Sequence, residues 1–431
     1  MKPGFYTIMA AQFFSSLADN ALLIASIALL IELDAPKEVT PLLKFFFTVS
    51  YVALAAFVGA FADSRPKGTV MFLTNTVKIA GCMVLLFSEF IALTGTEDYY
   101  IVLVAYGLVG LGAAAYSPAK YGILTELLPA EQLVIANGWI EGLTVSSIIL
   151  GTVVGGLLIN PRVSEVLLAM DIVPFDTGID SAPEAAMLII AFFYVVAAVF
   201  NLFIPDTGAR YAKQSANPIK LLSDFGHCFQ TLWRDKIGQI SLAVTTLFWG
   251  AGATLQFIVL KWAEVHLGLP LDKGAVLQGV VAVGIAVGAV VAARFVPLKQ
   301  SMKVLPYGVA MGFVVMLMVF VKSAWFAYPL CIIVGAMAGY FVVPMNALLQ
   351  HRGHVLLSAG HSIAVQNFNE NLNILVMLSV YALMIRADFS INTVIVLFGL
   401  FVSGTMALVM VWNRNNHRRE NLDHLIGEAK H

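Results

Sequence analysis

The amino-acid sequence predicts an all-α integral membrane protein with twelve transmembrane helices in two six-helix bundles and both termini in the cytoplasm. Of the 431 residues, 59% are hydrophobic and 12% are charged, whereas soluble globular proteins carry about 45–50% apolar and about 25% charged residues. The chain also contains twelve long apolar runs, and its Lys and Arg residues gather in alternate loops. These observations exclude a soluble enzyme.

Each apolar run is long enough to cross a bilayer as a helix, which requires roughly 20 mostly apolar residues. The runs lie near 5–32, 41–62, 69–93, 100–119, 133–159, 184–205, 238–262, 274–296, 303–321, 327–349, 361–385 and 392–412. Hydrocarbon leaves backbone polar groups unsatisfied, and the runs lack the alternation of barrel strands, so helices are expected. The first run is too long for a signal peptide and lacks an A-x-A-like cleavage site.

The distribution of positive charge predicts the orientation of these helices. With the N-terminus in the cytoplasm, the inside segments carry 17 of the 25 Lys and Arg residues and the outside segments carry six. The remaining two, Lys78 and Lys261, lie within runs, and the outside loops are acidic instead. Because Lys and Arg favour the cytoplasmic side, both termini are expected to be cytoplasmic.

A long polar stretch divides the chain into two similar parts. The expected domains are an N-terminal six-helix bundle at 1–205, a cytoplasmic linker at 206–237, a C-terminal six-helix bundle at 238–413 and a cytoplasmic tail at 414–431. The linker contains apolar residues at helical spacing between Leu221 and Trp233, which predicts a surface helix. Six spans, a long inside loop and six more spans are typical of transporters built from two halves.

Spans four and ten resemble each other in sequence. The segments 110–120 and 335–346 each begin with small residues, continue with an aromatic residue and reach a proline, Pro118 or Pro344. Small residues let neighbouring helices approach closely. The likeness is either a true internal repeat or a coincidence, since a weak motif alone does not decide.

The sequence argues against several kinds of partner and cofactor. The net charge of -1 offers no excess of positive charge for nucleic acid. The three cysteines, Cys82, Cys228 and Cys331, are scattered and predict neither a disulfide framework nor a metal site. No G-x-x-x-x-G-K-[ST] loop is present to hold a nucleotide. We therefore expect no cofactor and no metal.

The loop after span two carries the string GAFADSRPKG at 59–68. It resembles the signature loop of the Major Facilitator Superfamily, although Pro66 stands where that family usually has Gly. The resemblance implies a latch at the cytoplasmic face that holds one closed state and releases it. The residues of this latch would be Gly59, Asp63, Arg65 and Lys67. A plain positive-inside turn is the alternative.

Five further strings are similar to the bacterial lysophospholipid transporter family of that superfamily. They are FFSSLADNALL at 13–23, GAAAYSPAKYGIL at 112–124, FWGAGATL at 248–255, VPMNALLQ at 343–350 and AVQNFNEN at 364–371. The resemblance extends from span one to span twelve. It departs from the family at Gln256, where an Arg is expected, and Lys261 can supply that charge.

The resemblance implies a function and a location. Such a protein moves lysophospholipids, chiefly lysophosphatidylethanolamine, to the inner leaflet of the bacterial inner membrane by facilitated diffusion without ATP. A cytoplasmic-side acyltransferase then restores the second acyl chain, which implies a possible functional link to that enzyme. Monomers are usual in the superfamily, and span one lines its central cavity.

Polar groups within apolar spans are costly, so each is a candidate for function. The candidate substrate-binding residues are Asp19, Asn20, Tyr116, Lys120, Asn137, Glu141, Gln256, Lys261, Asn346, Gln366, Asn367 and Glu370. Asp19 and Asn20 can meet the ammonium of an ethanolamine head group, and Lys120 can hold a phosphate. Gln366, Asn367 and Glu370 share one face of span eleven, which must face protein or a water-filled cavity.

Structural roles compete with these assignments. Asp19 can instead pair with a lysine such as Lys78, which is itself expected to pair with an acid of span one or two. Lys120 and Lys261 can be interfacial residues whose charged ends reach water. Glu370 can close a cytoplasmic gate with Lys120 or Arg352 rather than bind substrate.

Three functions fit the sequence to different degrees. The first is a lysophospholipid transporter that works by alternating access. The second is a proton-coupled exporter of drugs or metabolites, which would use the acids Asp19, Glu141 and Glu370. The third, a membrane-embedded acyltransferase, is disfavoured because the chain has no H-x-x-x-x-D pair and no sizeable soluble domain.

Overall fold

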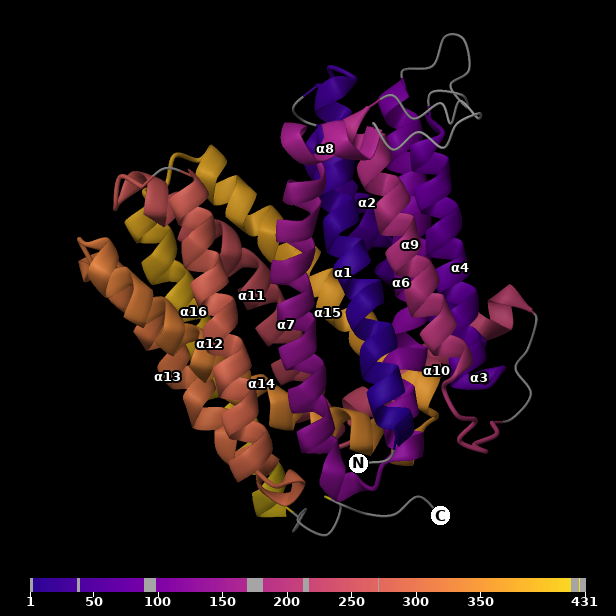
Figure 1. Ribbon diagram of the computed structural model, residues 1–431. Coiled ribbons are helices and arrows are strands. Elements are labelled where there is room, and N and C mark those ends of the chain that lie inside the picture. Colours follow the sequence, from indigo (N-terminus) through magenta and orange to yellow (C-terminus); the bar gives the residue numbers. More distant parts are fainter. Residues whose placement is uncertain are drawn as a thin grey trace. The chain divides into compact units, whose positions relative to one another are not determined.

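The computed structural model describes residues 3–36, 39–88, 98–168, 181–211, 217–269, 271–419 and 426. Within these residues, eleven helices are long and apolar enough to cross a membrane, and the number is twelve when the bent pair α2–α3 is counted as one span. The prediction of an all-α membrane protein with twelve spans is confirmed (Figure 1). The chain divides into two compact units, one of Met1–Ile123 and Ser146–Pro218, the other of Leu124–Val145 and Ile219–His431. The domain boundaries predicted at 205 and 238 stay a prediction.

The first unit contains the early spans. Its helices are α1 (Pro3–Glu32), α2 (Val39–Ala53), α3 (Ala55–Asp63), α4 (Lys67–Leu86), most of α6 (Asp98–Leu127), the second half of α7 (Leu133–Leu158), α8 (Pro161–Leu168) and α9 (Ala182–Leu202). Both α1 and α4 pack along α9. The helix α9 begins with a capping box, in which the side chains of Ser181 and Glu184 each bond the other's backbone N–H.

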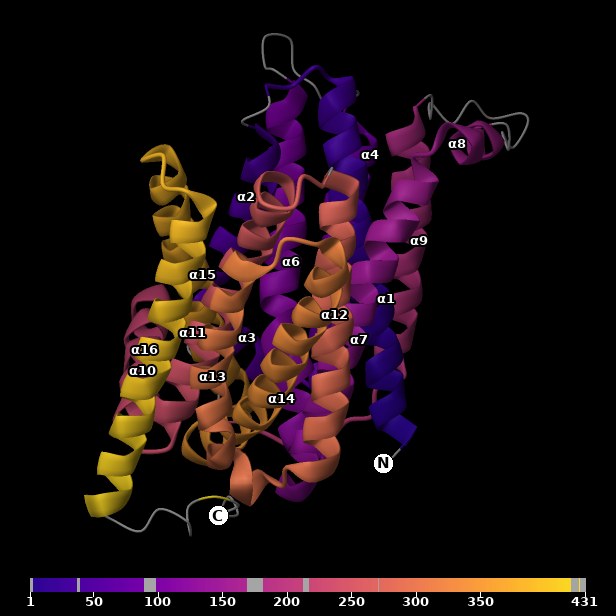
Figure 2. The same cartoon turned by 90° about the vertical axis from the view of Figure 1, so that its left-hand side faces the viewer.

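The second unit contains the later spans. Its elements are η1 (Ala130–Gln132), the first half of α7, α10 (Pro218–Arg234), α11 (Gly238–Val265), α12 (Leu271–Phe295), η2 (Leu298–Val304), α13 (Leu305–Met316), η3 (Leu317–Phe320), α14 (Ala324–Leu356), α15 (Ala359–Arg386) and α16 (Ile391–Arg419). The pairs α12–α14 and α13–α16 pack closely, as Figure 2 shows. The predicted surface helix of the linker is present as α10.

The same helix pairings recur in both units with an offset of six spans. In the first unit α9 packs on α1 and α4, and in the second unit α16 packs on their counterparts α11 and α13. The glycines Gly151 and Gly155 of α7 pack against α1, as α15 packs against α11. This recurrence supports reading the two halves of the chain as structural repeats.

The sequence likeness between spans four and ten corresponds to equivalent packing. A Cβ atom on Gly335 of α14 would lie 3.0 Å from the Cα of Gly284 of α12. A Cβ atom on Gly110 of α6 would lie 2.8 Å from the Cα of Phe47 of α2. In both units a glycine of the fourth span therefore lets it approach the second span of the same unit, which favours the repeat over coincidence.

The second span is broken, which the sequence did not predict. The helices α2 and α3 meet at an angle of 64° beside Leu54. The backbone N–H groups of Phe57 and Val58 both donate to the Leu54 carbonyl, at 2.8 and 3.0 Å. Breaks in helices usually coincide with Pro or Gly, and neither stands at this position, so the apolar run 41–62 gave no signal.

Candidate functional site

A buried ion pair forms the centre of a polar cluster in the first unit. The Lys78 ammonium of α4 lies 2.7 Å from Asp19 Oδ2 of α1 and donates to the Ser15 hydroxyl at 3.0 Å. The Tyr194 hydroxyl of α9 donates to Asp19 Oδ1 at 2.7 Å, and the Ser15 hydroxyl donates to the side-chain oxygen Oδ1 of Asn75 at 2.8 Å. We call Ser15, Asp19, Asn75, Lys78, Tyr116 and Tyr194 the Asp19 cluster.

The surroundings of the Asp19 cluster are aromatic and nearly dry. The Lys78 side chain is 2% exposed and the Asp19 side chain 20%, so the carboxylate has the greater access to solvent or ligand. The Lys78 nitrogen lies 5.1 Å from the ring centre of Tyr116 and 5.7 Å from that of Tyr194. Aromatic faces attract cations, so both rings help to hold the ammonium in place.

Two polar atoms of the Asp19 cluster have unused hydrogen-bonding capacity. Among the described residues, the Tyr116 hydroxyl and the Asn75 amide nitrogen are buried and make no hydrogen bond within the protein. Buried polar groups are normally satisfied by protein, water or ligand. These two groups therefore make the Asp19 cluster capable of accepting a polar ligand as well as holding its own ion pair.

The expected pairing of Lys78 with an acid of span one or two is confirmed, because Asp19 belongs to α1. Gly112 of α6 makes room for the lysine, since a Cβ atom there would lie 2.8 Å from Lys78 Cγ. The structure thus identifies Lys78 as the ion-pair partner of Asp19. This pairing does not test whether Asp19 also meets a substrate.

Two other predicted residues of the first unit make contacts away from this pair. The Asn20 amide donates to the Ser16 carbonyl at 2.8 Å, and its Cβ faces Gly151 of α7. The Lys120 nitrogen of α6 lies 4.1 Å from the ring centre of Tyr121. Lys120 is partly exposed, as an interfacial lysine or a phosphate ligand would be.

A second polar cluster lies in the second unit and contains four predicted site residues. Gln366 of α15 donates from its amide nitrogen to Glu370 at 2.7 Å and to Asn346 of α14 at 3.2 Å. The amides of Asn137 and Gln350 bond each other in both directions at 2.9 Å. We call Asn137, Asn346, Gln350, Gln366 and Glu370 the Gln366 cluster, and all five are at least nine-tenths buried.

The shared face predicted for span eleven is present in α15. Gln366, Asn367 and Glu370 are all buried in the protein rather than exposed to lipid. Arg352 of α14 pairs with the carboxylate of Asp235 at 2.8 Å, and the suggested gate between Glu370 and Lys120 or Arg352 stays a prediction. The remaining candidate, Glu141, lies in α7, and its side chain is outside the described residues.

The candidates Gln256 and Lys261 lie in α11 and make local contacts. The Gln256 amide donates to the Gln278 side chain of α12 at 3.3 Å. The Lys261 ammonium pairs with Glu264 at 3.0 Å, and both side chains are well exposed. An exposed pair at this spacing is typical of an interfacial lysine, the structural alternative.

The predicted latch has one buried ion pair. The Lys67 ammonium lies 2.6 Å from Asp63 Oδ1, donates to the Ala62 carbonyl and lies over the ring of Tyr211. Gly59 is buried in α3, and Arg65 is exposed. The charge network therefore centres on Asp63 and Lys67.

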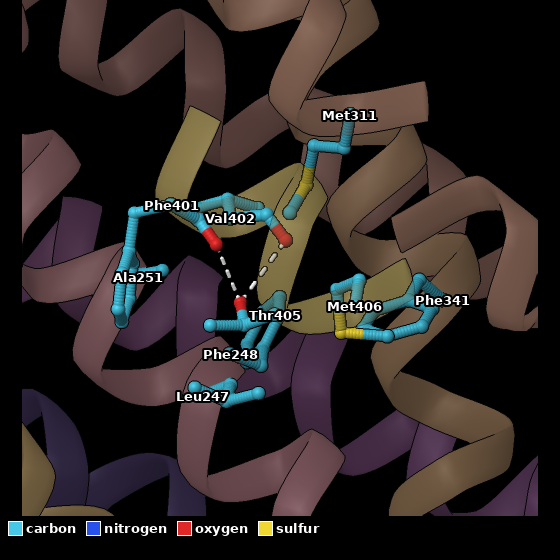
Figure 3. Close-up of a pocket in the computed structure, with 9 residues that line it drawn as sticks. All are labelled: Leu247, Phe248, Ala251, Met311, Phe341, Phe401, Val402, Thr405 and Met406. Carbon is cyan, nitrogen blue, oxygen red and sulfur yellow. Dashed lines mark hydrogen bonds between the residues drawn. The ribbon is translucent and has the colours of Figure 1, made fainter. Parts of the chain in front are cut away.

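One small crevice in the second unit is apolar. Its lining comes from α11, α13, α14 and α16 and includes Phe248, Met311, Phe341 and Met406 (Figure 3). The hydroxyl of Thr405 is directed to its own helix and donates to the carbonyls of Phe401 and Val402 at 2.6 and 3.1 Å. The crevice thus offers packing space but no free donor to a head group.

Three members of the Asp19 cluster were missed from the sequence, namely Ser15, Asn75 and Tyr194. Tyr194 follows Phe192 and Phe193 in an apolar run, which favoured a packing role. A usable signal was the spacing of polar residues, because Ser15 and Asp19 are four apart and Asn75 and Lys78 are three apart. Such pairs share one face of a helix.

Known proteins match this chain along most of its length. Residues 8–372 match the Major Facilitator Superfamily. The lysophospholipid transporter LplT of Yersinia enterocolitica is 41% identical over 90% of this chain and 88% of its own length. The protein of the same name from Photorhabdus laumondii is 39% identical over 95% of this chain and 96% of its own length.

Solved structures share the fold at low sequence identity. A bacterial homologue of the iron transporter ferroportin in an outward-facing state has a TM-score of 0.73 at 14% identity, with 97% of this chain and 100% of that chain covered. The transporter FucP in an outward conformation has a TM-score of 0.71 at 14% identity, with 96% and 98% covered. The chain therefore belongs to the Major Facilitator Superfamily and, within it, to the family of lysophospholipid transporters.

Proposed function

We propose that this multi-pass membrane protein moves lysophosphatidylethanolamine and related lysolipids across the bacterial inner membrane to the cytoplasmic leaflet, where they are re-acylated. The observation that carries the proposal is the identity of about 40% to lysophospholipid transporters over some nine-tenths of the chain. The match to the Major Facilitator Superfamily at residues 8–372 includes the residues of both polar clusters. The family is one of transporters and not of enzymes.

The chemistry of the polar clusters supports a zwitterionic head group as substrate. An ethanolamine head group carries an ammonium and a phosphate, and it must leave water to cross the membrane. The Asp19 cluster contains a carboxylate with partial access to solvent beside two unsatisfied buried polar atoms. Glu370 and Asn346 add acceptors in the second unit. A carboxylate attracts the ammonium, and Lys120 supplies positive charge for the phosphate.

The transport cycle we propose is alternating access, in which one half of the transporter rocks against the other. Asp63 and Lys67 would latch one closed state, because a buried pair holds strongly when it is formed and releases a helix end when it opens. The acyl chain of the lysolipid would remain against apolar span surfaces. No energy source is required when the lipid moves down its gradient.

The test is uptake of labelled lysophosphatidylethanolamine into vesicles that contain the full chain. Asp19→Asn is the informative variant, because it keeps the shape of the side chain and one acceptor oxygen, for either Tyr194 or Lys78, while the negative charge is lost. Uptake per folded molecule is expected to fall at least tenfold. Gln230→Ala, at an exposed position of α10, is the matched control. Full uptake by the Asp19→Asn variant would exclude Asp19 as a substrate ligand.

A proton-coupled exporter is the second candidate function. The observation that favours it is the presence of carboxylates inside spans, among them Asp19 of α1 and Glu370 of α15. Acids at such depth mark proton pathways in many transporters. This candidate requires that transport stop when the proton gradient is removed.

A further inference from the structure

The amphipathic helix α10 is attached to the second unit by specific polar contacts as well as by apolar packing. Its Leu232 is fully buried with Leu349 of α14 and Val365 of α15. The rings of Phe225 and Phe229 each contact Phe368 of α15 edge to face, at centroid distances of 5.5 and 6.1 Å. A helix that only rested on a membrane surface would present its apolar face to lipid instead.

A buried ion pair joins the end of α10 to α14. Arg352 donates from Nη2 to Asp235 Oδ2 at 2.8 Å and from Nε to both carboxylate oxygens at 3.1 Å. Asp235 Oδ1 also accepts the backbone N–H of Gly238, at 2.7 Å, where α11 begins. The Asp235 carboxylate thus connects α10, α11 and α14. The side chains of Asp235 and Arg352 are both almost fully buried.

Trp233, two residues before Asp235, joins α10 to α15. Its indole Nε1 donates to Asn369 Oδ1 at 3.3 Å, and its ring is stacked on Trp412 of α16. Asn369 directly precedes Glu370 and is three residues from Gln366. The end of α10 therefore holds two of the three helices that carry the Gln366 cluster, α14 through Asp235 and α15 through Trp233.

We propose that Trp233, Asp235 and Arg352 are positioning residues that hold α14 and α15 so that the Gln366 cluster is preformed for substrate. The proposal rests on the proposed lysolipid transport for its functional part only. Residues Val365, Phe368 and Asn369 touch α10 from one side of α15, while Gln366 and Glu370 lie on an adjacent side toward α14. When α10 is released, α15 is free to rotate or fray, and the Gln366–Asn346 bond is lost first.

Hydrogen exchange of the full-length protein in detergent tests the structural part without substrate. Trp233→Phe keeps the ring but removes the bond to Asn369, so amides of 359–370 should exchange about fivefold faster, as expected for loss of one hydrogen bond. Asn369→Ala should have the same effect, and the double variant should add little to either. Gln230→Ala, exposed on the same helix, should leave the exchange unchanged.

The ion pair between Asp235 and Arg352 allows a second, independent test by hydrogen exchange. Asp235→Asn and Arg352→Gln should each accelerate exchange in 359–370 and in the C-terminal turns of α14, because each leaves one buried charge without its counter-ion. The double variant Asp235→Asn with Arg352→Gln should return toward wild type. Unchanged exchange in Trp233→Phe, or a double variant worse than both single variants, would overturn the proposal.

Uptake kinetics separate positioning from general stability. Trp233→Phe should raise the KM for lysophosphatidylethanolamine about fivefold, equal to about 1 kcal/mol at 25 °C, and leave Vmax per folded molecule within about twofold. A change in Vmax alone, or faster exchange with an unaltered KM, would contradict the positioning role. A wild-type chain that moves no lysolipid would refute the proposed function, and exchange would then decide whether α10 holds α15.

Discussion

At the scale of single residues, the most consequential contact is the pair between Asp19 and Lys78. A lone charge in an apolar interior costs several kcal/mol, and a partner with additional hydrogen bonds offsets that cost. Asp19 accepts from Lys78 and Tyr194, both at 2.7 Å. Asp19 and Lys78 therefore depend on each other, and replacing either one leaves the other charge unpaired.

Neutralising Lys78 alone should be more damaging than neutralising both partners. Lys78→Met is expected to lower the free energy of unfolding by about 3 kcal/mol, because Asp19 keeps a charge without its counter-ion. The double variant Asp19→Asn with Lys78→Met should recover most of that loss. Thermal unfolding in detergent measures both, and a double variant less stable than Lys78→Met would show that the pair is not the source of the effect.

Residue roles were predictable where a charge interrupts an apolar run. Asp19 and Lys78 stand out for this reason, and their pairing was expected before the fold was known. Tyr194 and the amide pair Asn137–Gln350 were harder, because their partners lie 175 and 213 residues away in the chain. A tyrosine or amide in an apolar helix has no sequence signature that names its partner.

At the scale of helices, close crossings depend on glycine. In the crossing of α12 with α14, Gly284 and Gly288 face Gly335 and Gly339, and a Cβ on any of them would meet the backbone of the partner helix. Without a hydrophobic driving force between helices in lipid, such backbone packing carries much of the association. The spacing of four residues within each pair places both glycines on one face.

A single methyl group at this crossing should be costly. Gly339→Ala is expected to destabilise the protein by about 2 kcal/mol, since its Cβ would collide with the Ile285 carbonyl and force the helices apart. Gly279→Ala in α12 is the matched control, because no atom lies within 4 Å of the new Cβ. That change should be neutral or stabilising by up to about 1 kcal/mol through helix propensity. Equal melting temperatures for the two variants would refute the packing argument.

The latch between α3 and α4 makes a separate prediction at this scale. Lys67→Ala should reduce lysolipid uptake several-fold, because it removes the counter-ion of buried Asp63 and the bond to the Ala62 carbonyl. Arg65→Ala, two residues away and exposed, should retain uptake within about twofold, as is usual for surface substitutions. Equal losses in both variants would favour a plain positive-inside turn over a latch.

At the scale of the whole molecule, the fold was predictable because lipid imposes a simple rule on sequence. Every spanning segment must be long and apolar, so the count of twelve followed from hydropathy alone. The bend at Leu54 and the docking of α10 did not follow, because each depends on contacts between distant segments. The recurrence of helix pairings in the two units was predictable only in part. Its one sign in the sequence was the likeness of spans four and ten.

The energy source is a property of the whole molecule and separates the two candidate functions. Asp19 serves as the counter-ion of Lys78 and also accepts from Tyr194, which gives this carboxylate a structural role in place of proton transport. We therefore expect lysophosphatidylethanolamine uptake into proteoliposomes to continue at an unchanged rate after an uncoupler collapses the proton gradient. Glu370→Gln should likewise leave uptake insensitive to the uncoupler, whatever its effect on rate. Uptake that stops with the gradient, and becomes independent of it in Asp19→Asn or Glu370→Gln, would instead identify a proton-coupled transporter with that acid as its proton site.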